Sequence, residues 1–384
     1  MREWVPYKLK EITTKIGSGS TPTGGKEAYY QSGITLVRSL NIYDFVFELQ
    51  NLAFINEAQA KKLNGVTVQK DDILLNITGA SVGRCTIIPE YLIPARVNQH
   101  VSIIRCDKEK VDAKFLLYCI NSTSYKDALM SIADSGATRE ALTKDDIEKF
   151  QVLLPSLPLQ QHIASILSSY DDLIEVNNQR IKMLEETARE LYKEWFVRMR
   201  FPGYKNAKFV KGVPEGWEVK KLGDVIELAY GKALKEEDRK DGEFLVYGSS
   251  GIVGTHTSCI AKAPGIVVGR KGNVGSVFWV TKDFYPIDTA FFVKTKISLY
   301  YCYFNLQLQN FIEGDAAVPG LNRNQAYSLF MLIPTNNLLQ KFDDIIQPIF
   351  EMVSNLEDQN IQLRQIRDRL LPRLISGKLE VKEK

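Results

Sequence analysis

The residue types that perform catalysis are present in this sequence, but their spacing matches no catalytic motif. No phosphate loop of the form GxxxxGK(S/T), no GxSxG nucleophile elbow, no HExxH zinc motif and no glycine-rich dinucleotide fingerprint occurs. The Asn/Asp-Pro-Pro-aromatic tetrapeptide that is expected of an amino-methyltransferase is absent as well. The spacing therefore gives no support for a catalytic role and favours a protein that acts by binding.

The titratable side chains are distributed as structural residues. Adjacent aspartates occur at four places where a turn or a helix is predicted to begin, and a carboxylate there caps the helix or interacts favourably with its dipole. The three histidines are isolated, and the five cysteines form no CxxC pair, which predicts neither a disulfide framework nor a metal site. These residues are Asp71–Asp72, Asp145–Asp146, Asp171–Asp172, Asp343–Asp344, His100, His162, His256, Cys85, Cys106, Cys119, Cys259 and Cys302.

Hydrogen-bonding and cationic residues cluster in predicted turns, where they suit a nucleic acid. Arg and Lys can neutralise phosphates, and Arg, Asn and Ser can contact base edges in the major groove. For any one of these residues a solvated loop position is the simpler interpretation, but the clusters recur in both halves of the chain. The predicted DNA-binding residues are Ser18, Ser20, Thr21, Lys26, Arg38, Thr78, Ser81, Arg84, Thr138, Arg139, Lys144, Lys232, Lys235, Tyr247, Ser249, Arg270, Lys271, Asn273, Asn322 and Arg323, with Arg96, Ser250 and Asn324 in the same stretches.

Length and charge limit the class of protein. A chain of 384 residues is too long for one ordinary core and suits two domains with connectors. The net charge is only +3, so a basic surface must come from local segregation of Lys and Arg. The N-terminus has no apolar signal core and no run of roughly 18 apolar residues occurs. We therefore expect a cytoplasmic protein that is neither exported nor membrane-spanning.

A long helix is predicted near the middle of the chain, and a similar one near its end. Residues 159–197 contain neither glycine nor proline and would form a helix roughly 57 Å long. Apolar residues recur there every seven positions, as in the narrow a/d stripe of a coiled coil. Residues 338–371 have the same stripe, and a shift of 179 residues superimposes the two. The predicted helix-pairing residues are Ile163, Leu167, Tyr170, Ile174, Asn177, Ile181, Leu184, Leu191, Trp195, Phe342, Ile346, Ile349, Val353, Leu356, Asn360, Leu363 and Leu370.

We expect the two helices to pair antiparallel. Position numbers across an antiparallel pair have a constant sum, and Asn177 opposite Asn360 gives 537. That register sets Leu191 against Ile346, and a buried asparagine pair can fix the register at some cost in stability. The alternative is that both asparagines face water at the edge of the seam. Pro348 predicts a kink or a break within the second helix.

Landmarks recur in the same order in the two halves, which indicates a tandem duplication. WVPYKLKEI at 4–12 matches WEVKKLGDV at 217–225, and the β-rich run 71–88 matches 263–280. The predicted fold class is α+β, with two α/β domains, two long antiparallel coiled-coil-like helices and an internal pseudo-twofold repeat. The predicted segments are domain 1 at 1–155, the central helix at 156–200, a Gly/Pro-rich linker at 201–216, domain 2 at 217–334, the C-terminal helix at 335–376 and a tail at 377–384.

Four stretches of the chain resemble one protein family. They are LYKEWFVRMRFPG after the first helix, GVPEGWEVKKLGDVIELAYGK at the entry to the second domain, VYGSSGIVG at 246–254 and RLLPRLISGKLEV at 369–381. With these motifs the whole chain resembles the specificity subunit (HsdS) of type I restriction–modification systems. The resemblance implies that each α/β domain is a target recognition domain for one half of a bipartite, asymmetric DNA sequence. It also implies that the helices set the spacing of the half-sites and dock the methyltransferase subunits.

The resemblance also implies which chemistry belongs elsewhere. The family's subunit is non-catalytic and binds no cofactor. S-adenosylmethionine is expected on the modification subunits, and ATP and Mg are expected on the partner subunits that carry out translocation and cleavage. The expected partners are double-stranded DNA, modification subunits and restriction subunits, with no membrane. Two alternatives are a protein-interaction scaffold without DNA binding, and an enzyme with an unrecognised active site, for which the repeat leaves little room.

Overall fold

The structure is a computed structural model that describes residues 4–22, 24, 28–134, 140–311 and 320–381. The chain divides into two compact units. Unit 1 comprises Met1–Val176 and Asn360–Lys384, and unit 2 comprises Asn177–Gln359. Each unit therefore contains one α/β part, one portion of the first long helix and one portion of the second. The long helices are α6 (Leu157–Tyr192), which continues into a π-helical turn at Lys193–Val197, and α10 (Asn336–Ile375).

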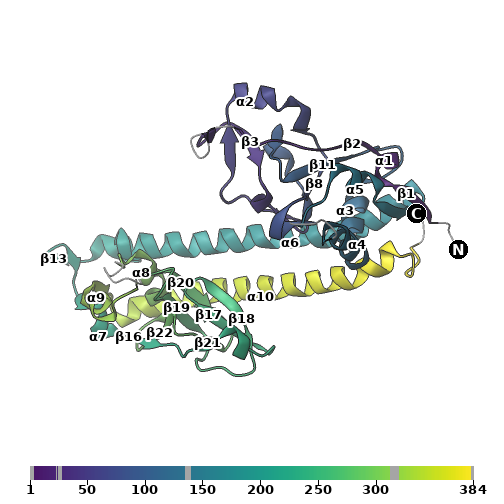
Figure 1. The fold of residues 1–384 in the computed structure, drawn as a ribbon. Helices are drawn as coiled ribbons and strands as arrows, with labels where there is room; N and C mark the ends of the chain where they lie inside the picture. The colour runs from purple at the N-terminus through teal and green to yellow at the C-terminus, as the bar shows by residue number, and fades with distance from the viewer. Residues whose placement is uncertain (1–3, 23, 25–27, 135–139, 312–319, 382–384) are drawn as a thin grey trace. The chain divides into compact units, whose positions relative to one another are not determined.

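Unit 1 contains two four-stranded sheets. Figure 1 labels β2, β8 and β11 of the first sheet and β3 of the second. The first has the order β2-β11-β8-β9 and the second the order β6-β3-β10-β7. A strand pair, β1 with β12, and a small hairpin, β4 with β5, complete its strands among the described residues. The bounds are β1 Val5–Lys8, α1 Leu9–Ile12, β2 Thr13–Ser18, β3 Ile34–Val37, β4 Ile42–Tyr43, β5 Val46–Phe47, β6 Ala53–Ile55, α2 Glu57–Lys62, β7 Thr67–Val68, β8 Ile73–Asn76, β9 Cys85–Ile87, β10 Ala95–Val97, β11 Val101–Cys106, α3 Ala113–Asn121, α4 Thr123–Asp134, α5 Lys144–Lys149 and β12 Gln151–Leu154.

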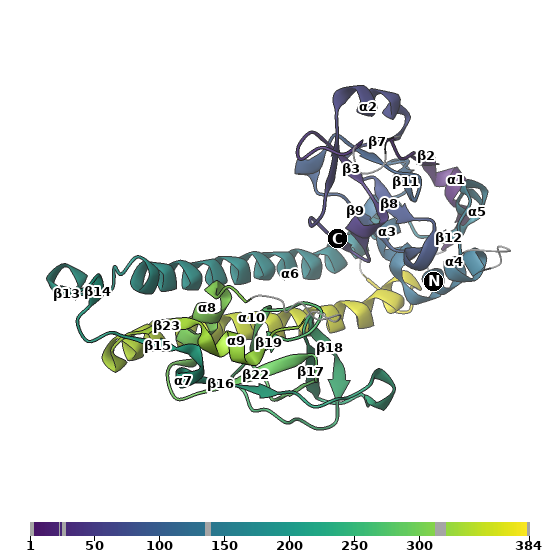
Figure 2. The ribbon, with the colours of Figure 1, turned by 60° about the vertical axis from the view of Figure 1, so that its left-hand side comes forward.

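Unit 2 repeats this plan (Figures 1 and 2). Its four-stranded sheet has the order β16-β22-β19-β20, its second sheet has the order β18-β17-β21, and β15 pairs with β23. A short hairpin, β13 with β14, precedes them. The bounds are β13 Phe209–Val210, β14 Val213–Pro214, β15 Glu218–Lys221, α7 Leu222–Val225, β16 Ile226–Tyr230, β17 Phe244–Gly248, β18 Gly251–His256, β19 Gly265–Gly269, β20 Val277–Val280, β21 Phe284–Pro286, β22 Ala290–Thr295, α8 Leu299–Leu308, α9 Arg323–Ser328 and β23 Phe330–Ile333.

The two units share one topology, as the duplication predicts. In the sheets β2-β11-β8-β9 and β16-β22-β19-β20 all neighbouring strands are antiparallel, and the strands of the two sheets correspond in this order. The one-turn helices α1 and α7 each follow a strand that pairs with the last strand before a long helix. The second sheet has four strands in unit 1 and three in unit 2. The additional strand accounts for part of the greater length of the α/β part of unit 1.

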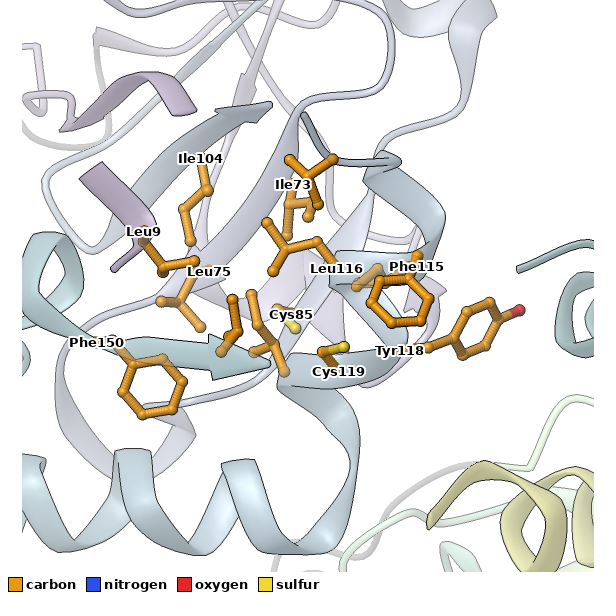
Figure 3. Packing of buried hydrophobic residues seen from close by; sticks show 14 of the residues in the cluster. Leu9, Ile73, Leu75, Cys85, Ile104, Phe115, Leu116, Tyr118, Cys119 and Phe150 are labelled. Atoms are coloured by element: carbon orange, nitrogen blue, oxygen red, sulfur yellow. The ribbon is translucent and has the colours of Figure 1, made fainter. Parts of the chain in front are cut away.

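The core of unit 1 forms where the first sheet packs on α3 (Figure 3). All four residues of β8 are buried, as expected of a central strand covered on both faces. Helix α3 begins where the side chain of Asp112 accepts a hydrogen bond from the amide of Phe115 at 2.8 Å, and Phe115 and Leu116 then point into the core. Each large apolar side chain buried in this way contributes about 1.5–3 kcal/mol to stability.

Portions of both long helices pack within each unit. In unit 1 Ile163 and Leu167 of α6 share a buried cluster with Leu371 and Leu374 of α10. In unit 2 the ring of Trp195 lies 5.9 Å from that of Phe342 between centroids, and these position numbers have the predicted sum of 537. The start of α6 thus packs with the end of α10, and the end of α6 with the start of α10. This is the antiparallel order that the sequence predicts.

The described burial of the helices follows the predicted stripe. Every predicted helix-pairing residue is buried or half-buried. Asn177 and Asn360 are 1% and 3% exposed, so the alternative in which they face water is wrong. Asn177 belongs to unit 2 and Asn360 to unit 1. That the two side chains pair with each other stays a prediction.

The predicted break at Pro348 does not occur. Helix α10 continues through this residue, and buried residues on both sides, Ile346 and Val353, hold it against its neighbours. Pro348 and Asp344, the residue one turn earlier, are both exposed. The carbonyl group that loses its amide partner therefore lies on the side of the helix that water can reach, which makes the proline tolerable.

Asp343 of α10 provides a pH-dependent prediction. Burial raises the pKa of its carboxyl above the ordinary 3.8, the hydrogen bond from the Ser298 hydroxyl lowers it, and the charge of Asp344 raises it. The folded state then binds a proton more readily than the unfolded state, so wild-type stability falls as pH rises from 3.8 through the raised pKa. Asp343→Asn retains an oxygen acceptor for Ser298 and removes the buried charge.

We expect D343N to unfold at higher denaturant concentration than wild type at pH 7. The difference in the free energy of unfolding between the two proteins should shrink as pH falls through the raised pKa of Asp343. Chemical denaturation at a series of pH values measures this. A difference that stays constant over the whole range would show that Asp343 does not titrate as described.

Candidate nucleic-acid interface

In unit 1 several predicted DNA-contacting residues meet at one end of the first sheet. Ser18 ends β2, Thr78 follows β8, and His100 precedes β11, with these strands hydrogen-bonded side by side. The Thr78 hydroxyl and His100 Nδ1 lie 2.6 Å apart, and the Thr21 hydroxyl donates to Oε1 of Gln99. Sequence reasoning had assigned His100 a structural role and had not selected Gln99.

Two arginines lie close to this sheet end. Arg84 is in the turn between β8 and β9, where its carbonyl accepts from the amide of Asn76 at 2.8 Å, and its guanidinium lies 4.9 Å from the ring centroid of Tyr43. Arg38 follows β3, donates to the carbonyl of Asn51 at 2.6 Å, and lies 5.5 Å from the ring of Tyr29. The buried Nε of Arg38 has no hydrogen-bond partner among the described residues. Stacking on tyrosine holds both cations in place.

The structure does not present every predicted residue of unit 1. Arg96 is buried and donates to the carbonyl of Ala60 at 3.1 Å and to the Asn64 side chain at 2.9 Å, so it supports the fold. Lys144 begins α5 and forms an ion pair with Glu148 at 3.3 Å. Ser20 is exposed just beyond β2, and Ser81 is half-buried in the β8–β9 turn. Lys26, Thr138 and Arg139 lie outside the described residues.

In unit 2 the same sheet end brings together Tyr230, Arg270 and Arg323. Tyr230 ends β16, Arg270 follows β19, and Arg323 begins α9. Leu321 ties α9 to this end, because its amide donates to the carbonyl of Arg270 at 2.7 Å. The Asn322 side chain caps α9 by accepting from two amides of its first turn. Tyr230 was not predicted from the sequence as a site residue.

The remaining predicted residues of unit 2 occupy different positions. The Ser276 hydroxyl donates to the carbonyls of Ser249 at 2.5 Å and Asn273 at 2.9 Å, so two turns are joined beside the sheet end. Lys271 follows Arg270, and its backbone forms an isolated antiparallel β-bridge with that of Gly320. Lys232 is exposed after β16, and Lys235 forms an ion pair with Glu237 at 3.3 Å. Ser250 and Asn324 are exposed beside Ser249 and Arg323.

Tyr247 is a correction to the predicted set. It lies in β17 and is 7% exposed, with its ring 5.7 Å from that of Phe284 in a buried cluster. Burial raises the pKa of Tyr247 to about 12, so it stays neutral. Tyr247 therefore packs in the core and is not a surface contact residue.

Backbone hydrogen bonds align the two sheet ends residue by residue. The amide of Ile77 donates to the carbonyl of His100 at 3.0 Å, and the amide of Arg270 donates to that of Thr289 at 2.9 Å. Two residues further along, Ser102 pairs with Ser18 and Phe291 pairs with Tyr230. The first residues of α5 and α9 also correspond. Ser18 therefore corresponds to Tyr230, Ile77 to Arg270, His100 to Thr289, and Lys144 to Arg323.

Several cations at these sheet ends have no carboxylate partner. Among the described residues no carboxylate forms an ion pair with the side chains of Arg38, Arg84, Arg270, Lys271 or Arg323. Lys144 and Lys235, which also belong to the predicted set, are paired. Cations grouped without neutralising carboxylates create a local positive potential even though the net charge of the chain is small.

Other chemistry finds little support in the described parts of the chain. They contain no group of three or more His, Cys, Asp or Glu side chains that could hold a metal ion. Burial raises the pKa of the Cys85 thiol and of the Cys302 thiol to about 12, and an unionised thiol is a poor nucleophile. Within the described residues no helix is long and apolar enough to cross a membrane.

Comparison with known proteins shows the family. The two similar α/β units, each with a cationic sheet end, define a general class of tandem-repeat binding proteins. The family model described as "Type I restriction modification DNA specificity domain" matches residues 1–186 and 214–328. The chain belongs to this family, and it has a DNA sequence-recognition role in a type I restriction–modification system.

Similar proteins align over nearly the whole chain. The type I restriction enzyme MjaIX specificity subunit of Methanocaldococcus jannaschii is 27% identical over 424 aligned residues, which cover 100% of this chain and 95% of that protein. The HindI specificity subunit of Haemophilus influenzae is 22% identical, with 99% and 100% covered. A crystal structure of a type I restriction–modification system S subunit from M. genitalium has a TM-score of 0.58 at 16% identity, covering 97% of this chain and 96% of that one. This likeness confirms the predicted fold class.

Proposed function

We propose that the chain is the specificity subunit of a type I restriction–modification enzyme and that each α/β part contacts one half of a bipartite DNA sequence. The supporting observation is that one sheet end with unpaired cations recurs at the corresponding place in both units. Guanidinium groups at such a surface can neutralise phosphates and can hydrogen-bond to base edges. A duplicated surface of this kind suits a target that also has two parts.

The two halves of the proposed target differ from each other, because the two sheet ends differ in chemistry. Unit 1 has an aliphatic side chain, Ile77, where unit 2 has Arg270. It has an imidazole, His100, where unit 2 has the hydroxyl of Thr289. A protein distinguishes base pairs by the hydrogen-bond donors, acceptors and apolar groups that they present in the grooves of DNA. Protein surfaces with different donors, acceptors and apolar groups therefore select different bases. The proposal is therefore an asymmetric target.

The long helices and the partner subunits complete the proposal. The helices set the distance between the two half-sites and dock the methyltransferase subunits. Methyl transfer from S-adenosylmethionine, and ATP- and Mg-dependent translocation and cleavage, then belong to the modification and restriction subunits. The chain itself contributes recognition without catalysis, in the cytoplasm. Support comes from the family to which the chain belongs.

Methylation mapping tests this function directly. The chain is expressed together with a cognate modification subunit, and modified adenines in the host DNA are located by sequencing. We expect one split motif, with two different defined halves around a gap of fixed length. Absent or sequence-independent methylation, with a stable complex confirmed, would instead favour a protein-interaction scaffold without DNA binding.

A further inference from the structure

Two guanidinium groups share one tyrosine ring in unit 2. The guanidinium carbon of Arg270 lies 4.9 Å from the ring centroid of Tyr230, and that of Arg323 lies 4.8 Å from it. Arg270 also lies 5.7 Å from the ring of Phe291, and Arg323 lies 5.8 Å from that of Tyr327. Tyr230 itself is 48% exposed, so the group lies at the surface.

The backbone around this group is held by hydrogen bonds. The Arg270 guanidinium donates from Nη1 to the carbonyl of Asp288 at 3.0 Å, and the Arg270 carbonyl accepts from Leu321. The hydroxyl of Tyr327 accepts from the amide of Leu228 in β16 at 2.9 Å, which fixes α9 to the strand that ends at Tyr230. The two arginines are therefore held in place before any ligand binds, so binding costs little additional side-chain entropy.

The charge of this group is not balanced by the described part of unit 2. Each cation–π contact at a partly exposed site contributes about 0.5–1 kcal/mol, which offsets some of the repulsion between like charges. Among the described residues neither guanidinium forms an ion pair with a carboxylate. Two fixed positive charges that share one ring therefore favour a ligand with a full negative charge.

We propose that Arg270, Tyr230 and Arg323 form a phosphate clamp that positions the DNA half-site of unit 2 without selecting its bases. This inference rests on the proposed function. A backbone phosphate bears a full negative charge and accepts hydrogen bonds from more than one guanidinium, whereas a base edge presents only partial charges and is satisfied by one bidentate arginine. Tyr230 is the positioning residue, because its ring contacts both cations.

The clamp belongs to one unit only. The corresponding positions in unit 1 are Ser18, Ile77 and Lys144, which provide no aromatic ring and no guanidinium, and Lys144 is paired with Glu148 at 3.3 Å. The two half-sites should therefore be held by different numbers of phosphate contacts. Loss of the clamp should weaken contacts to the half-site of unit 2 and leave those of unit 1 unchanged.

The test uses the complex of the full chain with its modification subunits and a duplex that contains the mapped target. Affinity is measured over a series of KCl concentrations for wild type, Arg270→Ala, Arg323→Ala and Tyr230→Ala. We expect each alanine variant to bind about tenfold more weakly and each arginine variant to reduce the slope of log K against log salt by about 1. Discrimination against single-base changes in either half-site should stay as in wild type.

Conservative and matched variants separate the clamp from simple misfolding. Arg270→Lys should retain the salt slope, because it keeps the charge, and Tyr230→Phe should bind like wild type, because it keeps the ring. Lys294→Ala is the matched control. Lys294 lies 5.6 Å from the ring of Phe292 at the other end of β22, but it is paired with Glu227 at 3.2 Å, so this variant should change neither affinity nor slope.

Three results would overturn the inference. Alanine variants that bind like wild type would show that the group does not contact DNA. A variant that retains the salt slope but loses discrimination at one base pair would show base recognition in place of phosphate contact. If the wild-type complex has no salt-dependent affinity for the duplex, the proposed function fails and the clamp fails with it, whereas the first two results leave the proposed function intact.

Discussion

Phe342→Ala should destabilise unit 2 by about 3–5 kcal/mol in the free energy of unfolding. Phe342 of α10 is fully buried, and its ring centroid lies 4.9 Å from that of Phe196, 5.9 Å from that of Trp195 and 6.2 Å from that of Phe304. Truncation leaves a cavity between two helices and the core, and it also removes aromatic pairs that contribute about 0.5–1.5 kcal/mol each. Chemical denaturation of the full chain, followed by tryptophan fluorescence, measures the change.

Ile345→Ala is the matched control for this prediction. Ile345 lies three residues further along α10 and is 44% exposed, so its truncation creates no cavity. Alanine also has the higher helix propensity, and we expect a change within about 0.5 kcal/mol. If both variants lose the same stability, α10 does not pack on the core of unit 2 through Phe342, and the predicted seam would have to be reassigned.

The helix-pairing residues could be predicted from the sequence because they depend only on a seven-residue repeat along each helix. A seven-residue repeat places residues such as Leu167 and Ile174 of α6 on the same side of the helix whatever surrounds it. Both are buried. The register followed from one assumption, that Asn177 opposes Asn360, and Trp195 and Phe342 satisfy it within unit 2. The tolerance of Pro348 could not be foreseen, because it depends on which side of the helix faces water.

The sequence predicted which turns form the candidate DNA-binding surface, but it identified only some of the residues that meet there. Turn chemistry located Arg270 and Arg323, but their shared neighbour Tyr230 is brought to them by the pairing of β16 with β22, which no local pattern specifies. The same limitation explains the errors. Arg96 of β10 and Tyr247 of β17 are buried together with both of their neighbours along the strand, so other elements cover both faces of these strands. Whether a strand is covered on both faces depends on distant parts of the chain, which no local pattern specifies.

Arg367→Met should destabilise unit 1 by about 1.5–3 kcal/mol, because it removes a charge-assisted hydrogen bond and leaves a half-buried carboxylate without its cation. Arg367 of α10 is 8% exposed, forms an ion pair with Asp171 of α6, and lies 4.3 Å from the ring of Phe45. Asp171 also accepts from the hydroxyl of Tyr118 on α3, whose pKa is raised by burial and by the charge of Asp171, so the hydroxyl stays protonated and continues to donate. One ion pair thus joins both helices to the α/β part of unit 1.

Arg364→Met makes the same replacement at an exposed position one turn earlier on α10, and we expect a change within about 0.5 kcal/mol. A triple variant, R367M with D171L and Y118F, removes the three polar groups of this contact together and leaves Asp368, the exposed second partner of Arg367. Since replacing a buried ion pair by apolar groups of similar volume is often close to neutral, it should recover most of the stability that R367M loses. Equal loss in the single and triple variants would show that packing of the arginine stem on Phe45, and not the buried charge, determines the effect.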